Sequence, residues 1–231
     1  MRTILAIETS SDLASAALLY NGRLLARDTS GVQTHSQSVL PMVQQLLAEA
    51  GIALAQCDAI AFGAGPGSFT GVRTACGVAQ GLAFGAELPV VPVVTLQAMA
   101  QACRERCGAD EVLAVLDARM EEVYWAQYRF DNDNGWHAVT EPALASASEV
   151  TASGQVQVTA CGNGLLAYAS AFGDKGFAVC PGIVPHAAQV AALAQAELLA
   201  GRGIHAREAQ PIYLRNKVAL TTAERQAKAA A

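Results

Sequence analysis

The order of apolar segments constrains the fold of this 231-residue chain more than any other feature. Three segments with strand character open the chain at residues 3–7, 14–20 and 23–29, and the last two flank Asn21-Gly22, a strong hairpin signal. Helical and strand segments then alternate, and this order returns loosely in the second half. Hairpin strands pair antiparallel, whereas strands joined through helices pair parallel. The sequence therefore predicts an α/β protein with two related lobes and mixed sheets.

The remaining boundaries follow from hydrophobic periodicity and turn residues. The helix expected at residues 35–50 carries apolar side chains at helical spacing, with Pro41 near its start. We expect the lobes to cover residues 1–106 and 107–231, with a helix and a basic tail of the second lobe packing back on the first. The other expected elements are strands at 58–63, 90–94, 111–117, 122–130, 136–140 and 155–160, and helices at 70–85, 95–106 and 186–200.

Composition excludes several classes of protein. Apolar residues make up 52% of the chain and charged residues 15%, a balance opposite to that of disordered proteins. The net charge is -5, whereas a protein that grips nucleic acid alone usually has a basic face. From Arg202 onward basic residues outnumber acidic ones, which fits a solvated terminus better than an RNA contact. No apolar run approaches the roughly 18 residues of a membrane span, and Glu8 interrupts any signal-peptide core, so we expect a cytoplasmic protein.

The six cysteines form no C-x-x-C pair. In a cytosolic chain we expect them to be reduced, small and buried. Cys103 and Cys107 lie one helical turn apart, and a metal or disulfide role for them is the lesser alternative. No histidine is followed by another four residues later, so we expect no helical two-histidine site and no bound metal.

Residues 63–73 are glycine-rich and lie between a strand and a helix. Glycines there let backbone N–H groups approach a ligand, and the helix N-terminus favours an anion. The spacing fits neither common phosphate-loop fingerprint nor a nucleophile elbow, and a tight connection capped by Ser68 or Thr70 is an equal alternative. The carboxylate and hydroxyls that end the first strand could likewise hold a phosphate or metal, or simply form turns. The candidate anion or nucleotide cleft comprises Glu8, Thr9, Ser10, Gly65, Gly67 and Ser68.

A second glycine pattern lies on the following helix. Gly77, Gly81 and Gly85 recur every four residues and leave one helical face without side chains. Each glycine destabilises a helix by about 1 kcal/mol relative to alanine. Such a face implies that something packs very close to it, either another helix of this chain or a partner subunit.

Several motifs, taken in order, resemble one known family. They are Ile7-Glu8-Thr9-Ser10-Ser11, the helix start from Thr34-His35-Ser36 to Leu40-Pro41, the glycine-rich residues 65–73, Leu116-Asp117-Ala118-Arg119 with Glu122-Val123-Tyr124, and Pro211 with Tyr213-Leu214-Arg215. Together they resemble the TsaB family, also called YeaZ, which is needed to make threonylcarbamoyladenosine in tRNA. The resemblance covers nearly the whole chain, and the glycine-rich segment is its most specific part. Met120 departs from the basic residue that the family pattern places there.

The resemblance implies an actin/sugar-kinase/Hsp70-type fold of two ribonuclease-H-like lobes. It also implies a non-catalytic relative of TsaD, the subunit that transfers the threonylcarbamoyl group. TsaD-type proteins carry two histidine metal ligands on the first helix, where this chain has only His35. Their second-lobe nucleotide turn is Gly-Gly, and residues 161–164 are at most a remnant of it. We therefore expect no catalytic residue, no metal and no tightly bound cofactor, with ATP or ADP bound only at the level of a complex.

The family resemblance also implies partners. The first two helices would dock a TsaD-like transferase subunit, or a second copy of the chain to form a homodimer when it is alone. A TsaE-like ATPase is the third implied partner, tRNA is reached indirectly, and no membrane is involved. The expected interface residues are Val39, Met42, Val43, Leu46, Gly77, Gly81 and Gly85.

Two enzymatic alternatives remain open. An ATP-dependent small-molecule kinase of the same fold would use Glu8 or Asp12 with the loop at residues 65–68. Tight ATP binding with turnover by the isolated protein would favour it. A peptidase is the lesser alternative, because a metallopeptidase needs metal ligands at close spacing.

Overall fold

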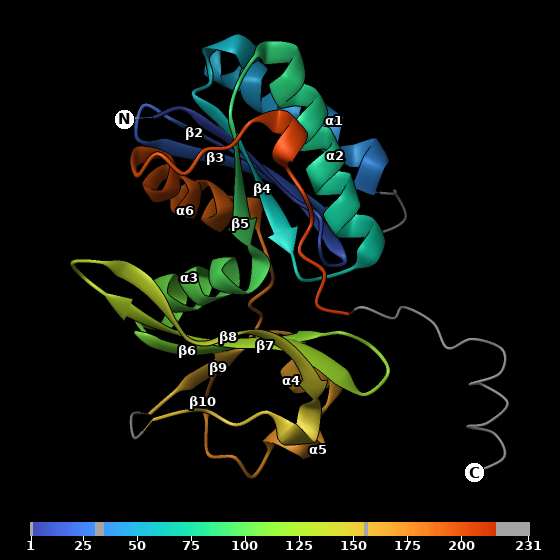
Figure 1. Ribbon diagram of the computed structural model, residues 1–231, viewed down its shortest axis with the longest axis vertical. Helices are drawn as coiled ribbons and strands as arrows, with labels where there is room; N and C mark the ends of the chain where they lie inside the picture. The colour runs from blue at the N-terminus through green and yellow to red at the C-terminus, as the bar shows by residue number, and fades with distance from the viewer. Residues whose placement is uncertain (1, 31–34, 155–156, 216–231) are drawn as a thin grey trace, which may run out of the picture.

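The computed structural model describes residues 2–30, 35–154 and 157–215, which form two α/β lobes stacked along the long axis (Figure 1). Each lobe is built on a five-stranded mixed sheet. This confirms the α/β class and the two-lobed division expected from the order of apolar segments. Thr34 and the basic residues Lys217, Arg225 and Lys228 lie outside the described residues.

The first sheet has the order β3-β2-β1-β4-β5. The hairpin strands β1, β2 and β3 pair antiparallel, and β4 and β5 continue from β1 in parallel. The register places Leu18 opposite Leu25 and Ile7 opposite Phe62. The strands are β1 (Ile4–Glu8), β2 (Leu13–Tyr20), β3 (Arg23–Ser30), β4 (Ala59–Gly65) and β5 (Val90–Val94).

The second sheet repeats this topology, with the order β10-β9-β6-β7-β8. Its first three strands again pair antiparallel, and the last two again add in parallel. The same strand order in both sheets is the one expected of ribonuclease-H-like lobes. The strands are β6 (Glu111–Asp117), β7 (Glu122–Asp131), β8 (Gly135–Ser146), β9 (Thr159–Cys161) and β10 (Ala178–Cys180).

Helices α1 (His35–Ala50) and α2 (Phe69–Ala86) cover one face of the first sheet (Figure 1). The apolar stripe of α1 packs into the same core as Leu18 and Phe62. Ser68 caps α2 by accepting a hydrogen bond from the Gly71 N–H at 3.5 Å. A short 3-10 helix, η1 (Leu54–Gln56), connects α1 to β4.

The two lobes exchange helices across their boundary. Helix α6 (Ala187–Leu199) lies on the other face of the first sheet, where Val190 and Ala194 pack in one cluster with Ile4 and Ala6. Helix α3 (Thr95–Cys107) packs mainly on the second sheet, through Leu96, Met99, Ala100 and Cys103. Figure 1 shows α3 between the two sheets. The expected boundary after residue 106 assigns α3 to the first lobe, whereas its core contacts assign it to the second.

Smaller elements complete the second lobe. Its outer face is covered by α4 (Gly164–Ala167), α5 (Ala169–Phe172) and η2 (Ala147–Glu149). Strand β8 extends beyond the expected end at Thr140 and includes Pro142. Because β8 is an edge strand, it tolerates a residue without an N–H. Strand β9 is shorter than expected, and residues 155–156 lie outside the described part of the chain.

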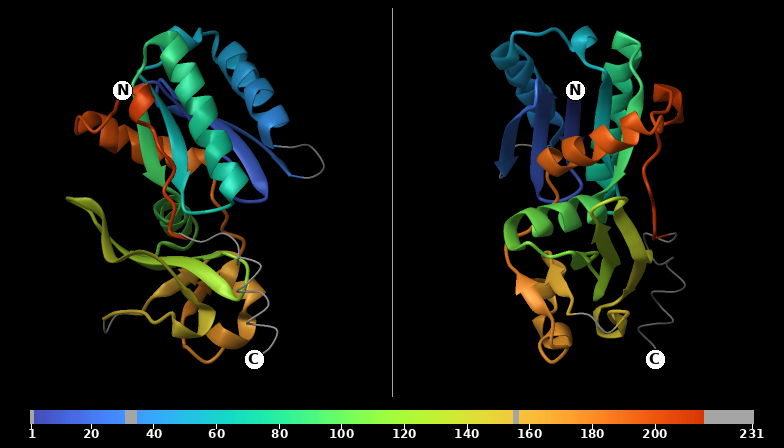
Figure 2. Two further views of the ribbon diagram at one scale, coloured as in Figure 1. Left: turned by 45° about the vertical axis from the view of Figure 1, so that its right-hand side comes forward. Right: turned by 90° about the vertical axis from the view of Figure 1, so that its left-hand side faces the viewer.

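The end of the described chain forms a strap, residues 209–215, that runs from the first lobe to the second (Figure 2). Just before it, η3 (Ala206–Glu208) is held to α2 by Gln80, whose Nε2 donates to the carbonyls of Ala206 and Ala209 at 3.1 Å each. The N–H of Ile212 donates to the Ala64 carbonyl at 2.7 Å. Leu214 then packs against the core of the second lobe. The strap therefore touches both lobes within a few residues.

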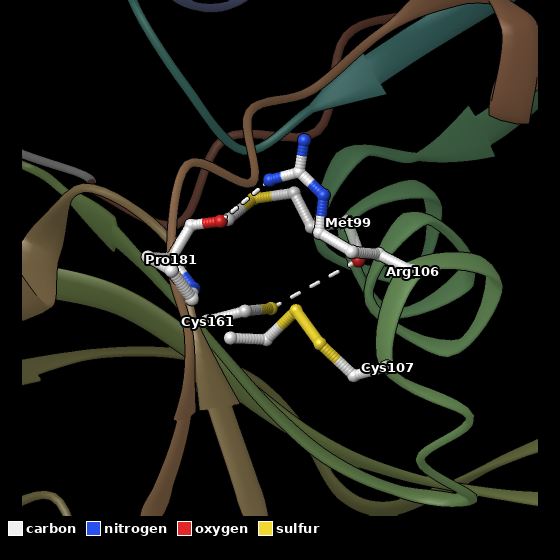
Figure 3. The surroundings of a disulfide bond; sticks show 6 residues. Met99, Arg106, Cys107, Cys161 and Pro181 are labelled. Atoms are coloured by element: carbon white, nitrogen blue, oxygen red, sulfur yellow. Dashed lines mark hydrogen bonds between the residues drawn. A yellow bond between two sulfur atoms is a disulfide. The ribbon is translucent and has the colours of Figure 1, made fainter.

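The cysteines differ from expectation in one respect. Cys107 at the end of α3 and Cys180 at the end of β10 form a disulfide, although all six were expected to be reduced (Figure 3). Their separation of 73 residues in sequence gave no local signal for the pairing. Cys57, Cys76, Cys103 and Cys161 are free and buried, as expected.

Within the described ranges, no helix combines the length and the apolar character needed to cross a membrane.

Candidate functional site

A cavity of about 280 Å³ lies between the lobes, where the turn after β1, the turn after β6 and the strap meet. The first lobe contributes Ser10, Gly67 and Ser68 to its wall. The second lobe contributes Asp117 and Asn163, and the strap covers part of the cavity. Half of the six predicted cleft residues therefore line this cavity.

Glu8 and Thr9 are fully buried and do not line the cavity. The Glu8 Oε1 accepts a hydrogen bond from the Ser10 N–H at 2.5 Å, and the Thr95 hydroxyl donates to Oε2 at 3.5 Å. Burial raises the pKa of Glu8, and these hydrogen bonds offset only part of that effect. Its carboxylate thus shapes the turn after β1 from inside the lobe.

The glycines of the loop serve close packing against that turn. A Cβ on Gly67 would lie 2.6 Å from the Ser10 Cβ, and one on Gly71 would lie 1.9 Å from the Thr9 carbonyl oxygen. The Ser68 N–H donates to the Ser10 carbonyl at 2.7 Å. The two segments that were expected to surround an anion therefore pack directly on each other. Anion or nucleotide binding at the remaining cavity wall stays a prediction.

Two other glycines make equally close contacts. Gly65 has φ +109°, and a Cβ there would lie 2.8 Å from the Ile212 carbonyl oxygen of the strap. Gly63, which begins the glycine-rich segment but was not among the predicted cleft residues, lies beneath Glu8, and a Cβ there would lie 1.7 Å from Glu8 Oε2. Gly63 falls at the end of a predicted strand, and a glycine in a strand often marks a place where another group comes close to the backbone, here the Glu8 carboxylate.

In the part of the cavity wall that the second lobe contributes, Asp117 at the end of β6 makes several hydrogen bonds. The Tyr168 hydroxyl and the Arg119 N–H donate to its Oδ1 at 2.9 Å and 2.8 Å, and its own N–H donates to Asn163 Oδ1 at 2.9 Å. Gly162 has φ +110°, and a Cβ there would lie 2.0 Å from the Val115 carbonyl oxygen. This glycine of the remnant turn thus packs against the backbone of β6.

The turn after Asp117 is strained. Arg119, Met120 and Glu121 all adopt left-handed φ values of 63°, 59° and 63°. A run of non-glycine residues in this region is unfavourable and needs support from neighbours. Arg215 of the strap supplies part of it, because its Nη2 donates to the Arg119 carbonyl at 3.4 Å and to the Glu122 carboxylate. The sequence motifs contain these residues but do not indicate that they touch.

The strap is held to the first lobe by a stack of aromatic and cationic side chains. The rings of Phe69 and Tyr213 lie 5.6 Å apart between centroids. The Arg73 guanidinium lies 3.7 Å from the Phe69 ring centroid, and its Nε donates to the Tyr213 hydroxyl at 2.8 Å. Hydrogen bonding and cation–π contact together fix the strap over the start of α2.

The predicted interface residues divide into two groups. The first, on α1, is buried in the core of its own lobe and consists of Val39, Met42, Val43 and Leu46. The apolar stripe of this amphipathic helix faces the sheet that it covers, so a contact between these side chains and a partner stays a prediction.

The second group is the glycine row of α2. Gly77, Gly81 and Gly85 are exposed. No heavy atom of the described chain lies within 4 Å of a Cβ built on any of them. This excludes close packing against another described helix, which was one of the two alternatives. Contact with a partner subunit stays a prediction.

No pair of histidines provides a metal site among the described residues. The group there that could share a metal ion is Cys103, Cys107 and Cys180. His35, at the start of α1, has its Nε2 3.4 Å from the Asp12 carbonyl oxygen.

Known proteins resemble this chain over nearly its full length. The Haemophilus influenzae protein named tRNA threonylcarbamoyladenosine biosynthesis protein TsaB is 43% identical over 226 residues, which cover 94% of each chain. The Escherichia coli protein of the same name is 41% identical over 223 residues, covering 94% of this chain and 96% of that one.

Solved structures show the same fold. YeaZ from Pseudomonas aeruginosa superposes with a TM-score of 0.87 at 40% identity, covering 93% of this chain and 100% of that one. A Pseudomonas aeruginosa structure described as similar to the peptidase YEAZ gives a TM-score of 0.88 at 39% identity, with the same coverage. The family model described as TsaD, tRNA N6-adenosine threonylcarbamoyltransferase, matches residues 25–219. The sequence, the repeated lobe and these matches together place this chain in the TsaB (YeaZ) family.

Proposed function

We propose that this protein is a non-catalytic subunit of the machinery that adds threonylcarbamoyl to adenosine of tRNA. In this role it docks and activates a TsaD-like transferase subunit, together with a TsaE-like ATPase. The names of its relatives support the process, and the match to the TsaD family model supports a fold shared with the transferase. Because the substrate of that machinery is tRNA, we expect the protein to act in the cytoplasm.

The glycine row of α2 carries the proposal for docking. Glycines inside a helix are destabilising, and no described part of the chain uses the space above Gly77, Gly81 and Gly85. A face without side chains allows the backbone of a partner helix to approach closely. Phe84 follows Gly81 by three residues on the same face and is 75% exposed. An exposed aromatic ring beside a flat surface is a suitable anchor for a partner.

The turn after β1 is packed against the glycine-rich loop, and this packing supports the proposal that the isolated chain is not catalytic. Glu8 is buried, so its carboxylate is not available to a ligand in the cavity. The glycine-rich loop and the turn after β1 contact each other directly. We propose that the chemistry belongs to the transferase, that this chain has no tightly bound cofactor, and that ATP or ADP enters only at the level of the complex.

Co-purification with the TsaD-like transferase tests the docking surface. Gly81→Arg places a long charged side chain on the glycine row, and we expect it to abolish the complex. Gly173→Arg is the matched control, because Gly173 is also exposed, has φ -56° and lies in the second lobe. Unchanged co-purification of Gly81→Arg would contradict the docking surface, provided that the variant retains the circular dichroism spectrum of the original protein.

The same surface accounts for a homodimer when the transferase is absent. Sedimentation of the isolated protein should show a dimer, and Gly81→Arg should shift it to a monomer. A dimer that survives this substitution would place self-association elsewhere. Because tRNA is reached through the complex, the isolated protein should not retard tRNA in a gel.

Two alternatives are tested by the same preparation. A kinase would use the cavity, whose wall contains Asp12 and Ser68, so saturable ATP binding with turnover by the isolated protein would replace our proposal. A peptidase is suggested by the description of one structural relative. Hydrolysis of a peptide substrate by the isolated protein, abolished by a chelator, would support that alternative.

A further inference from the structure

Three cysteine sulfurs meet between α3 and β10. Cys103 and Cys107 lie one turn apart at the end of α3, and Cys180 ends β10. Their Sγ atoms all lie within 4.8 Å of one another. The disulfide joins two of them, and Cys103 places a third sulfur beside it, in a thiol that hydrogen-bonds with the Cys161 thiol.

A fourth cysteine nearby does not belong to this group. The Cys161 thiol donates to the Met99 carbonyl oxygen at 3.9 Å (Figure 3). Its sulfur is not among those that lie within 4.8 Å of one another. The group therefore offers three sulfur ligands, two of them buried, while Cys107 faces solvent.

We propose that Cys103, Cys107 and Cys180 form a binding site for one Zn²⁺ ion when the disulfide is reduced. Thiolates are preferred ligands of this ion. Tetrahedral coordination with Zn–S bonds of about 2.3 Å needs sulfurs about 3.8 Å apart. The limit of 4.8 Å on every sulfur–sulfur distance is about 1 Å above that value, so a small shift of the ligands is enough, while the bonded pair must separate. A water molecule would complete tetrahedral coordination, and Cys107 is the exposed member of the group.

The surroundings of the group suit a metal ion. Arg106 Nη1 donates to the Pro181 carbonyl at 2.6 Å and so holds the segment after Cys180 against α3 (Figure 3). This contact keeps the ligands from the helix and the strand close together. Arg104 and Arg106 lie in the last turn of α3 with Cys107, and their positive charge favours the net negative charge of a three-thiolate zinc centre.

The disulfide and the zinc site are alternative states of the same sulfurs. A dithiol reductant breaks the Cys107–Cys180 bond, gives two electrons and two protons to form two thiols, and leaves as its own disulfide. The three thiols then bind Zn²⁺ and release three protons to solvent, leaving the three-thiolate centre with a net charge of -1. Two-electron oxidation of the centre by a disulfide oxidant restores the bond and expels the metal.

Zinc and cobalt titrations test this site. The full-length protein is reduced with dithiothreitol, freed of the reductant without oxygen, and titrated with Zn²⁺ against a chromophoric chelator. We expect one ion per chain for reduced protein and none for oxidised protein. Co²⁺ in place of Zn²⁺ should give thiolate-to-metal charge-transfer absorption, which identifies sulfur ligands.

Cys103→Ala distinguishes the metal site from the disulfide. This variant retains Cys107 and Cys180, so formation of the disulfide reports correct folding. We expect reduced Cys103→Ala to bind Zn²⁺ at least about tenfold more weakly, since even loss of an outer-shell partner has an effect of that size. Cys76→Ala is the matched control, because Cys76 is a buried free cysteine in the other lobe. Absence of zinc binding by the reduced original protein, or equal affinity of Cys103→Ala, would overturn the proposal.

Discussion

Thr9 and Gly71 contact each other twice. The Thr9 hydroxyl donates to the Gly71 carbonyl at 2.6 Å, and the Thr9 carbonyl occupies the space that a Cβ of Gly71 would fill. Gly71→Ala would bring that Cβ within 1.9 Å of a fully buried backbone oxygen. We expect a loss of about 2–3 kcal/mol in the free energy of unfolding, measured in urea. An unchanged midpoint would show that the turn after β1 can shift without penalty.

Alanine on the glycine row should have the opposite effect. A Cβ on Gly77 meets no described heavy atom within 4 Å, so Gly77→Ala removes only the disadvantage of glycine in a helix. We expect the isolated protein to gain about 0.5–1 kcal/mol of stability in urea. Co-purification with the transferase should weaken at the same time. If Gly77→Ala is more stable and binds the transferase equally well, Gly77 is not part of the docking surface.

The buried carboxylate predicts a pH dependence of stability. Because burial raises the pKa of Glu8, there is a pH window above its ordinary value in which the native protein holds a proton that the unfolded chain has lost. The contribution of this group to stability therefore falls as the pH rises through that window. Glu8→Gln should flatten the fall in unfolding free energy as the pH rises above the ordinary pKa of a glutamate. Glu141→Gln, at an exposed position, is the control and should leave the slope unchanged.

The strap can be tested through its ion pair. The side chains of Arg215 and Glu122 are 14% and 38% exposed, respectively. A double-mutant cycle with Arg215→Ala and Glu122→Ala should give a coupling energy of about 0.5–1 kcal/mol in urea unfolding. Coupling should decrease in high salt. Strictly additive effects would mean that the pair does not hold the strap to the second lobe.

The disulfide should stabilise the protein, because it closes a long stretch of the unfolded chain. With a sequence separation of 73 between the cysteines, chain entropy gives an upper estimate of about 4 kcal/mol. Reduction followed by alkylation, with a chelator present, should lower the urea midpoint. Cys107→Ser should reproduce this loss, and Cys76→Ala should not. Equal midpoints for the oxidised and reduced protein would contradict the stabilising role.

Much of the fold follows from local patterns. Strand β5 and helix α1 occur where periodicity and turn residues place them, because their apolar spacing and boundaries agree. The full length of β8 was not predicted. A proline such as Pro142 is rare inside a strand, and only the sheet order shows that β8 is an edge strand, where proline is tolerated. The sequence also assigned α3 to the first lobe. The apolar residues of a helix show that one face is buried, but they do not show which of two sheets that face covers.

The candidate site was less predictable for the same reason. Ser10, Gly67 and Ser68 of the predicted cleft line the cavity, whereas Glu8 does not. The sequence alone does not distinguish a glycine that makes room for a ligand from one that makes room for neighbouring backbone. Cys180 has no local feature that points to Cys107. Both relationships depend on contacts between distant segments, which only the assembled lobes define.

The exchange of α3 and α6 has a consequence for synthesis on the ribosome. One face of the first sheet, which includes Ile4 and Ala6, is covered by α6 at residues 187–199. That face remains open while the intervening residues are translated, so the lobe made first cannot be completed until nearly the whole chain has emerged. A nascent chain halted before residue 187 would carry an uncovered apolar sheet and would depend on chaperones to stay out of aggregates.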